Sequence, residues 1–144
     1  MLLAEDQPDL RELLAEVLRA DGYGVVAVPD GASLLRVLDE GGSGAPSLVV
    51  TDVHLPGLWG LDSVALAREL IPAVPVVVIT AFGSDELRAQ AGRVGARAVL
   101  DKPFELGQLL GLARRLAPRS SLSDARPADW PYLHELEAGP GGAP

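Results

Sequence analysis

The stretch Leu48-Val49-Val50-Thr51-Asp52 is a short, almost wholly apolar run that ends in a carboxylate. The pattern recurs in Met1-Leu2-Leu3-Ala4 before Glu5-Asp6, in Val76-Val77-Val78-Ile79 before Thr80, and in Ala98-Val99-Leu100 shortly before Lys102. Strands of a parallel sheet that is buried on both faces read as continuous apolar runs. Ligands collect at the carboxyl ends of such strands. We therefore expect three carboxylates, one hydroxyl and one ammonium to share a single cleft.

Segments with helical periodicity separate these runs. The first expected helix follows Pro8 and carries Leu10, Leu13, Leu14, Val17 and Leu18, and the second follows an Asp30 cap and carries Leu34, Leu35 and Leu38. The third carries Leu61, Val64 and Ala65, and the fourth, a weak helix with Gly92 and Gly95, follows a Ser84 cap. The fifth carries Leu106, Leu109, Leu110, Ala113 and Leu116 and ends before Pro118. The expected strands are residues 1–4, 25–28, 47–51, 76–79 and 96–100. This alternation predicts a doubly wound α/β fold of five βα units, with a parallel sheet and helices on both of its faces.

Composition restricts the class of protein. The chain has 144 residues, 48% of them apolar, which suits one domain with a substantial core. Its net charge of −8 argues against a nucleic-acid partner, because phosphate contacts need a basic surface. It has no cysteine, no apolar stretch of about 18 residues and no signal-peptide pattern, so we expect a cytoplasmic protein without disulfides, thiolate metal sites or membrane spans.

Two regions differ in character along the chain. We expect a folded domain over residues 1–117 and a linker or tail rich in Pro, Gly and Ser over residues 118–144. Within that tail Trp130, Leu133 and Leu136 share one helical face. We interpret this stripe as part of the linker, with a partner-binding segment as the alternative.

The residues of the expected cleft suit phosphoryl chemistry. Glu5, Asp6 and Asp52 offer the oxygen ligands that Mg²⁺ prefers. A carboxylate such as that of Asp52 can attack phosphorus to form an acyl phosphate, and Lys102 and Thr80 can neutralise or hydrogen-bond the transferred group. Taken alone, Glu5-Asp6 could equally be a strand end that caps the following helix, and Asp52 could equally be a turn residue. The ordered set favours a site.

The chain resembles the receiver domains of response regulators from bacterial two-component signalling. The matching segments are Leu2-Leu3-Ala4-Glu5-Asp6-Gln7-Pro8-Asp9-Leu10-Arg11, Thr51-Asp52-Val53-His54-Leu55-Pro56-Gly57, Ile79-Thr80-Ala81-Phe82-Gly83 and Leu100-Asp101-Lys102-Pro103-Phe104, in the family's order over residues 1 to about 117. The resemblance implies a flavodoxin-like, CheY-like fold.

The resemblance also implies a role for each site residue. Asp52 would be the phospho-acceptor, Thr80 the switch hydroxyl and Lys102 the salt-bridge partner of the phosphoryl group. Mg²⁺ would be held by Glu5, Asp6, Asp52 and the backbone carbonyl of His54. The donor would be a phosphohistidine on a sensor histidine kinase or a phosphotransfer protein, and the output would be a downstream protein. The protein would act as a switch rather than as a turnover enzyme. A homodimer through the fourth helix, fifth strand and fifth helix would be one assembly.

Two positions depart from the family pattern. Val99 stands where the family usually has its switch aromatic, and Trp59 precedes Gly60 where an acid is common; we expect Trp59 at the rim of the cleft. These departures keep open a phosphorylation-independent interaction module, and a receiver fragment of a longer transcriptional regulator is a further alternative. An aspartyl phosphatase is disfavoured because His54 replaces the second acid such enzymes carry. We interpret His54 itself as a surface imidazole.

Overall fold

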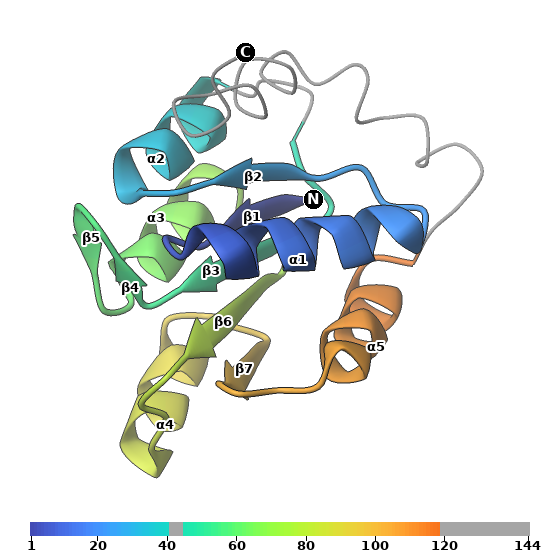
Figure 1. Ribbon diagram of the computed structural model, residues 1–144. Helices are drawn as coiled ribbons and strands as arrows, with labels where there is room; N and C mark the ends of the chain where they lie inside the picture. Colours follow the sequence, from blue (N-terminus) through green and yellow to red (C-terminus); the bar gives the residue numbers. More distant parts are fainter. Residues whose placement is uncertain (41–44, 119–144) are drawn as a thin grey trace.

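The computed structural model of the protein describes residues 1–40 and 45–118, so the predicted tail, with Trp130, lies outside the described residues apart from Pro118. The elements, in chain order, are β1 (Leu2–Ala4), α1 (Pro8–Ala20), β2 (Val26–Val28), α2 (Gly31–Glu40), β3 (Val49–Asp52), β4 (His54–Leu55), β5 (Leu58–Trp59), α3 (Asp62–Leu70), β6 (Val76–Thr80), α4 (Asp85–Arg93), β7 (Ala98–Asp101) and α5 (Leu106–Leu116). The predicted alternation of five buried strands with five helices is confirmed (Figure 1).

The main sheet has five parallel strands in the order β2-β1-β3-β6-β7. From β1 the chain moves outward to β2 and then returns past β1 to build β3, β6 and β7 on the other side. The strand order therefore reverses between β1 and β3, and such a switch point leaves a crevice at the carboxyl ends of the two strands. Glu5 follows β1 and Asp52 ends β3, so both lie at this crevice.

The side chains of each strand alternate between two hydrophobic layers. Leu3, Val50 and Val77 face the layer that contains buried residues of α1 and α5. Their neighbours Leu2, Val49 and Val76 face the layer that contains buried residues of α2 and α3. Because each strand is covered on both faces, its apolar run is continuous instead of alternating with polar residues. The predicted helices on both faces of the sheet are confirmed.

Two helix caps act as predicted. The Asp30 carboxylate accepts a hydrogen bond from the Ser33 amide at 2.8 Å, and α2 begins at the next residue, Gly31. The Ser84 hydroxyl oxygen accepts one from the Leu87 amide at 3.0 Å at the start of α4. These caps satisfy backbone donors that have no partner within the helix.

Some details of the elements were not expected from the sequence. Leu13 and Leu35, which the helical pattern grouped with the apolar residues of their helices, are 44% and 39% exposed. The periodic stripe of each helix is wider than the strip that touches the sheet, which is why its edge residues reach solvent. Leu55-Pro56-Gly57 was expected to form a turn, and residues 56–57 do so; the two-stranded antiparallel hairpin of β4 and β5 around Gly57, whose φ is +88°, was not expected. Glycine adopts this left-handed conformation without steric cost.

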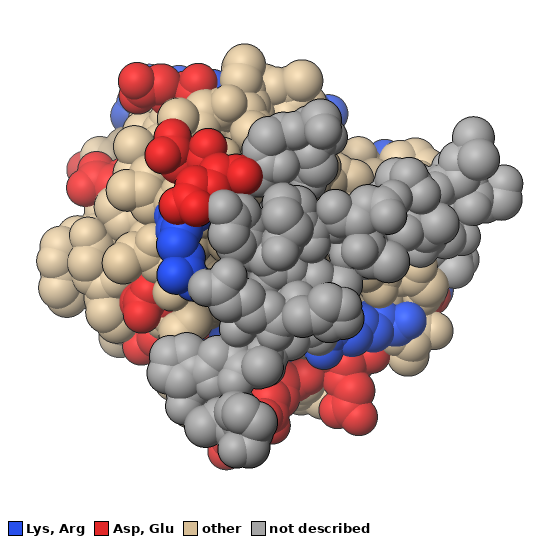
Figure 2. Space-filling model, turned by 90° about the horizontal axis from the view of Figure 1, so that it is seen from above, with Lys and Arg blue, Asp and Glu red and all other residues tan. Residues whose placement is uncertain are grey.

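The surface agrees with the acidic composition. On the face drawn in Figure 2, the uncovered basic side chains form small groups bordered by acidic ones. Within residues 1–40 and 45–118, no helix combines the length and apolarity needed to cross a bilayer.

Candidate functional site

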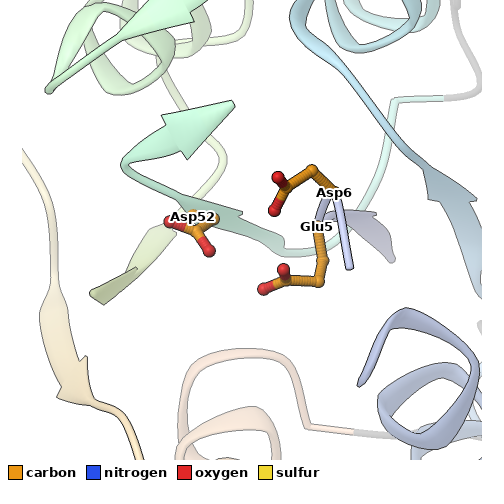
Figure 3. Close-up of side chains that lie close together, drawn as sticks. All are labelled: Glu5, Asp6 and Asp52. Atoms are coloured by element: carbon orange, nitrogen blue, oxygen red, sulfur yellow. The ribbon is translucent and has the colours of Figure 1, made fainter. Parts of the chain in front are cut away.

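Three carboxylates meet at the crevice between β1 and β3. Glu5, Asp6 and Asp52 each offer one oxygen, and these oxygens all lie within 4.8 Å of one another. Figure 3 shows the three side chains gathered in the space between the two strand ends. Glu5 and Asp52 are 0% and 3% exposed, whereas Asp6 is open to solvent. The predicted acidic cluster is therefore assembled, with one wall accessible from outside.

Glu5 is the most enclosed of the three acids. Its Oε2 accepts a hydrogen bond from the Gln7 amide at 3.1 Å. Its Oε1 lies 3.0 Å from Nζ of Lys102, close enough for an ion pair but without a hydrogen-bond partner in good geometry. The pKa of Glu5 is raised to about 7, because burial, together with the charge of Asp52, outweighs the lowering by the Gln7 amide and the Lys102 ammonium. Glu5 is thus an acid that carries a proton for part of the time near neutral pH.

Asp52 has a partner on each carboxylate oxygen. Oδ1 accepts a hydrogen bond from the His54 amide at 2.8 Å, and Oδ2 accepts one from Nζ of Lys102 at 2.6 Å. Burial alone would raise the pKa of Asp52, but the bond and charge of Lys102 and the bond from His54 outweigh it. The pKa of Asp52 therefore lies below its usual value, and the side chain is the anionic member of the cluster, as a nucleophile must be.

Lys102 closes the cleft from the side of β7. Its ammonium pairs with Asp52 and Glu5, and its amide donates to the Thr80 carbonyl at 2.7 Å. Burial would lower the pKa of Lys102, but the bonds and charges of the two carboxylates raise it above the ordinary value. The peptide bond that joins Lys102 to Pro103 is cis. The ammonium points inward, as predicted.

Thr80 is the last residue of β6. In the sheet register Asp52 pairs with Ile79, so Thr80 lies one residue beyond that pair. The Thr80 side chain is fully buried, and its hydroxyl oxygen accepts a hydrogen bond from the Phe82 amide at 3.1 Å. A hydroxyl that accepts one bond still has its own proton to donate. Thr80 therefore ends the strand next to the one that carries Asp52, with a donor available.

Two aromatic residues neighbour His54, which borders Asp52. His54 of β4 pairs across the hairpin with Trp59 of β5, which is 69% exposed; the place of its side chain at the rim of the cleft stays a prediction. The His54 ring also packs edge-on against Phe82, with ring centroids 5.8 Å apart. Phe82 is itself 77% exposed. The predicted surface imidazole of His54 is half-exposed and sits 3.8 Å from Oδ1 of Asp52.

The donor set suits a hard divalent cation. All three clustered side chains are carboxylates, and one buried oxygen, Oε1 of Glu5, has no aligned hydrogen bond. Magnesium prefers oxygen ligands and retains several waters, for which the exposed side of Asp6 leaves access. The residues present therefore fit such an ion.

Sequence reasoning did not identify every residue that supports the site. The Thr51 hydroxyl lies beneath Asp52, 3.1 Å from the Asp52 carbonyl and 3.3 Å from the Ser63 hydroxyl of α3. Arg11 of α1 donates to the Glu5 carbonyl at 3.0 Å. Neither contact has a signature in the chain, because threonine, serine and arginine occur at many positions without such a role.

The fold and the cleft together define a class of protein: a doubly wound α/β domain that carries a lysine-closed acidic site at the switch point of its sheet. Residues 1–114 match the response regulator receiver domain, and the chain belongs to this family.

Curated relatives support the same assignment. The chain is 40% identical over 117 residues to the response regulator protein FleR of Pseudomonas aeruginosa, covering 81% of this chain and 24% of that one. It is 32% identical over 124 residues to the transcriptional regulatory protein CpxR of Escherichia coli, covering 86% of this chain and 51% of that one. The chain thus spans about half or less of the length of these relatives.

Solved structures agree with the fold. The receiver domain of NtrX from Brucella abortus is 32% identical, with a TM-score of 0.73, over 83% of this chain and 98% of that one. The non-phosphorylated HemR receiver domain from Leptospira biflexa is 28% identical, with a TM-score of 0.71, over 83% and 94% of the two chains. The protein therefore contains the receiver domain of a two-component response regulator.

Proposed function

We propose that Asp52 accepts a phosphoryl group from a phosphohistidine on a sensor histidine kinase or a phosphotransfer protein. The observation that carries this proposal is the environment of the Asp52 carboxylate. It is anionic because its pKa is lowered, it is held by Lys102, and it lies within 4.8 Å of two further acids. A nucleophile, a fixed cation and a cluster of metal-type ligands are the parts that phosphoryl transfer to a carboxylate requires.

The transfer balances with the residues present. An oxygen of Asp52 attacks phosphorus, the P–N bond to the donor imidazole breaks, and the imidazole leaves with the electron pair and takes up a proton. Lys102 Nζ, now 2.6 Å from Oδ2, then faces an oxygen of the new acyl phosphate. Thr80 donates its hydroxyl proton to another oxygen of the group. The phosphoryl group stays on Asp52, which cannot accept another until it is removed, so the domain is a switch that is set once per transfer.

Glu5, Asp6 and Asp52, with the carbonyl of His54, would hold Mg²⁺. When bound, this ion would neutralise charge on the transferring group. It would also relieve the repulsion of three clustered carboxylates, which Lys102 balances only in part. Asp6, as the exposed member, would be the ligand that the ion meets first.

The output would be carried by the surface around α4 and β7. Thr80 pairs in register with Asp101, which belongs to β7 and contacts Arg88 of α4. A movement of Thr80 toward a phosphoryl group would therefore reach both elements, biasing two states already in exchange. This face would bind a downstream protein or a second copy of the domain.

A phosphorylation-independent interaction module is the second candidate. Val99 of β7 is a partly buried aliphatic residue that packs with the α2–α3 layer, so a switch aromatic is missing from the path between Thr80 and the output face. This candidate predicts an unchanged output face on phosphorylation.

The curated relatives are much longer than this chain. We propose that the domain regulates a further output region in the same way that a receiver serves a longer transcriptional regulator, and that it acts in the cytoplasm.

The test is labelling with acetyl phosphate in the presence of Mg²⁺. We expect the parent protein to take up one phosphoryl group and Asp52→Asn to take up none, while Asp39→Asn, which changes an exposed acid at the end of α2, is labelled like the parent. Labelling of Asp52→Asn at the parent rate would refute the proposal. Native mass spectrometry measures the added mass directly.

A further inference from the structure

Glu5 and Asp6 are consecutive residues whose carboxylates both point into one cleft. In an extended strand, consecutive side chains point to opposite faces. Yet both residues place an oxygen within the 4.8 Å cluster that includes Asp52 (Figure 3). The chain must therefore bend after β1, which ends at Ala4, and something must hold the bend.

The backbone of this bend is only partly held by secondary structure. The Glu5 amide still donates to Val28 of β2 at 3.1 Å, so the segment begins in the sheet. Helix α1 begins at Pro8, which has no amide proton, and its first ladder bond runs from the Arg11 amide to the Gln7 carbonyl at 2.9 Å. The carbonyls of Glu5 and Asp6 therefore precede the helical ladder and need partners from elsewhere.

The side chain of Arg11 supplies that partner. Its Nη1 donates to the Glu5 carbonyl at 3.0 Å and lies 3.5 Å from the Asp6 carbonyl, at the outer limit of a hydrogen bond. The same residue thus starts the helix through its amide and fastens the bend through its guanidinium. A hydrogen bond from a charged donor is stronger than one between neutral groups.

We infer that Arg11 is a positioning residue, which holds the Glu5–Asp6 bend so that both carboxylates face the metal position. The inference rests on the proposed Mg²⁺ site, and it predicts a change in Mg²⁺ affinity that is opposite to the change expected from charge alone. Acting through charge alone, the Arg11 cation would repel Mg²⁺, so its removal would tighten binding. Acting through the bend, its removal weakens binding because the ligands lose their orientation.

Arg19 provides a matched control on the same helix. Its Nη2 donates to the Val25 carbonyl at 2.7 Å, near the end of α1 that is remote from the cleft. Arg11→Gln and Arg19→Gln therefore each remove one positive charge and the contact of a guanidinium with backbone carbonyl oxygen. Only the first removes it at the Glu5–Asp6 bend.

The experiment is a Mg²⁺ titration of the full chain, in which binding is measured by calorimetry and by changes in amide NMR signals. We expect Arg11→Gln to raise the Kd for Mg²⁺ by about tenfold and Arg19→Gln to leave it unchanged. Arg11→Lys should recover most of the affinity, because an ammonium can still donate to the Glu5 carbonyl. Equal or tighter Mg²⁺ binding by Arg11→Gln, or equal losses in both glutamine variants, would overturn the inference.

A second measurement needs no metal. The Gln7 amide is bonded to the Glu5 carboxylate within the bend, so its hydrogen exchange reports on the bend directly. We expect exchange at Gln7 to be severalfold faster in Arg11→Gln than in the parent or in Arg19→Gln, and unchanged exchange would contradict the role of Arg11. If the parent shows no saturable Mg²⁺ binding while Gln7 exchange rises as expected, the proposed metal function fails and the structural role of Arg11 stands.

Discussion

Nζ of Lys102, which directly follows β7, lies 2.6 Å from Oδ2 of Asp52 at the end of β3, although β6 runs between these two strands. The same ammonium lies 3.0 Å from Oε1 of Glu5, so one cation serves two buried carboxylates. In the absence of a metal ion, this arrangement makes Lys102 the counterion of the cluster. Lys102 and Mg²⁺ would therefore compete for the same negative charge before phosphorylation, and they would act together after it.

Lys102→Met should separate these two effects. Without the ammonium, the pKa of Asp52 rises toward its ordinary value, and Mg²⁺ should bind more tightly because a competing cation is gone. Labelling by acetyl phosphate should nonetheless fall, by at least about tenfold, because a preorganised positive group is lost from the transferring oxygens. Calorimetry and the labelling rate measure the two quantities.

The control for Lys102→Met is Arg93→Met, which removes a positive charge from the exposed end of α4. It should change neither quantity. Weaker Mg²⁺ binding by Lys102→Met would contradict the competition between the two cations.

Glu5 should make metal binding depend on pH. Its pKa is raised to about 7, so below pH 7 a proton must leave before a metal ion can bind. We expect Mg²⁺ affinity to increase between pH 6 and pH 8, by no more than about tenfold per pH unit, and then to level off. Glu5→Gln should bind more weakly and lose most of this dependence, as measured by titrations across that range. An equally steep dependence in Glu5→Gln would show that another group titrates.

The same residue should affect stability with the opposite trend. The folded-state pKa of Glu5 lies above the unfolded value, so its contribution to the free energy of unfolding is complete below about pH 4.5 and is lost as the pH rises through about 7. Without Mg²⁺, the stability of the parent relative to Glu5→Gln should therefore fall as the pH rises from about 5 to about 7. The buried Met1 amino group, whose pKa is lowered to about 5, has the opposite trend, but it contributes equally to both proteins. Asp52, whose pKa is lowered, adds nothing to the trend in this window. Urea unfolding of the parent and of Glu5→Gln isolates the difference, and parallel curves would contradict this account.

Two glycines should respond oppositely to alanine. At Gly31 an added Cβ would lie 2.6 Å from Cγ and 2.9 Å from Cβ of Leu58, in the β4–β5 hairpin. Gly31→Ala should destabilise the fold by about 1–3 kcal/mol, because Leu58 must move away. Gly92 lies in α4 with open space around it, so Gly92→Ala should stabilise the fold by about 0.5–1 kcal/mol. Denaturant midpoints test both, and a stabilised Gly31→Ala protein would show that the hairpin yields freely.

Thr80→Val should uncouple the site from the output face. The substitution keeps the volume but removes the hydroxyl that accepts from Phe82 and would donate to a phosphoryl oxygen. We expect beryllofluoride, which mimics the phosphoryl group, to shift amide signals of α4 and β7 in the parent and in Thr80→Ser. The shifts should be much smaller in Thr80→Val. Equal shifts in all three proteins would remove Thr80 from the signalling path, and no shift in the parent would favour the phosphorylation-independent module.

Local patterns in the sequence were sufficient for the order and type of the main elements. Continuous apolar runs marked the buried parallel strands, and helical periodicity with Asp30 and Ser84 caps marked two helix starts. These signals are local, because a residue's neighbours within a few positions decide which face it can bury and which amide it can cap. The β4–β5 hairpin was missed because strands of only two residues are too short to show an alternating pattern.

The sequence by itself determined which acids, hydroxyl and lysine end the strands, and therefore that they would meet at one edge of a parallel sheet. Only the tertiary structure decided how they meet. It paired Lys102 with Glu5 as well as Asp52, set the pKa values of the two acids on opposite sides of their ordinary values, and brought Arg11 to the Glu5 carbonyl. Burial and the distance between charges depend on residues that are far apart in the chain, and so they arise only when the strands and helices pack together.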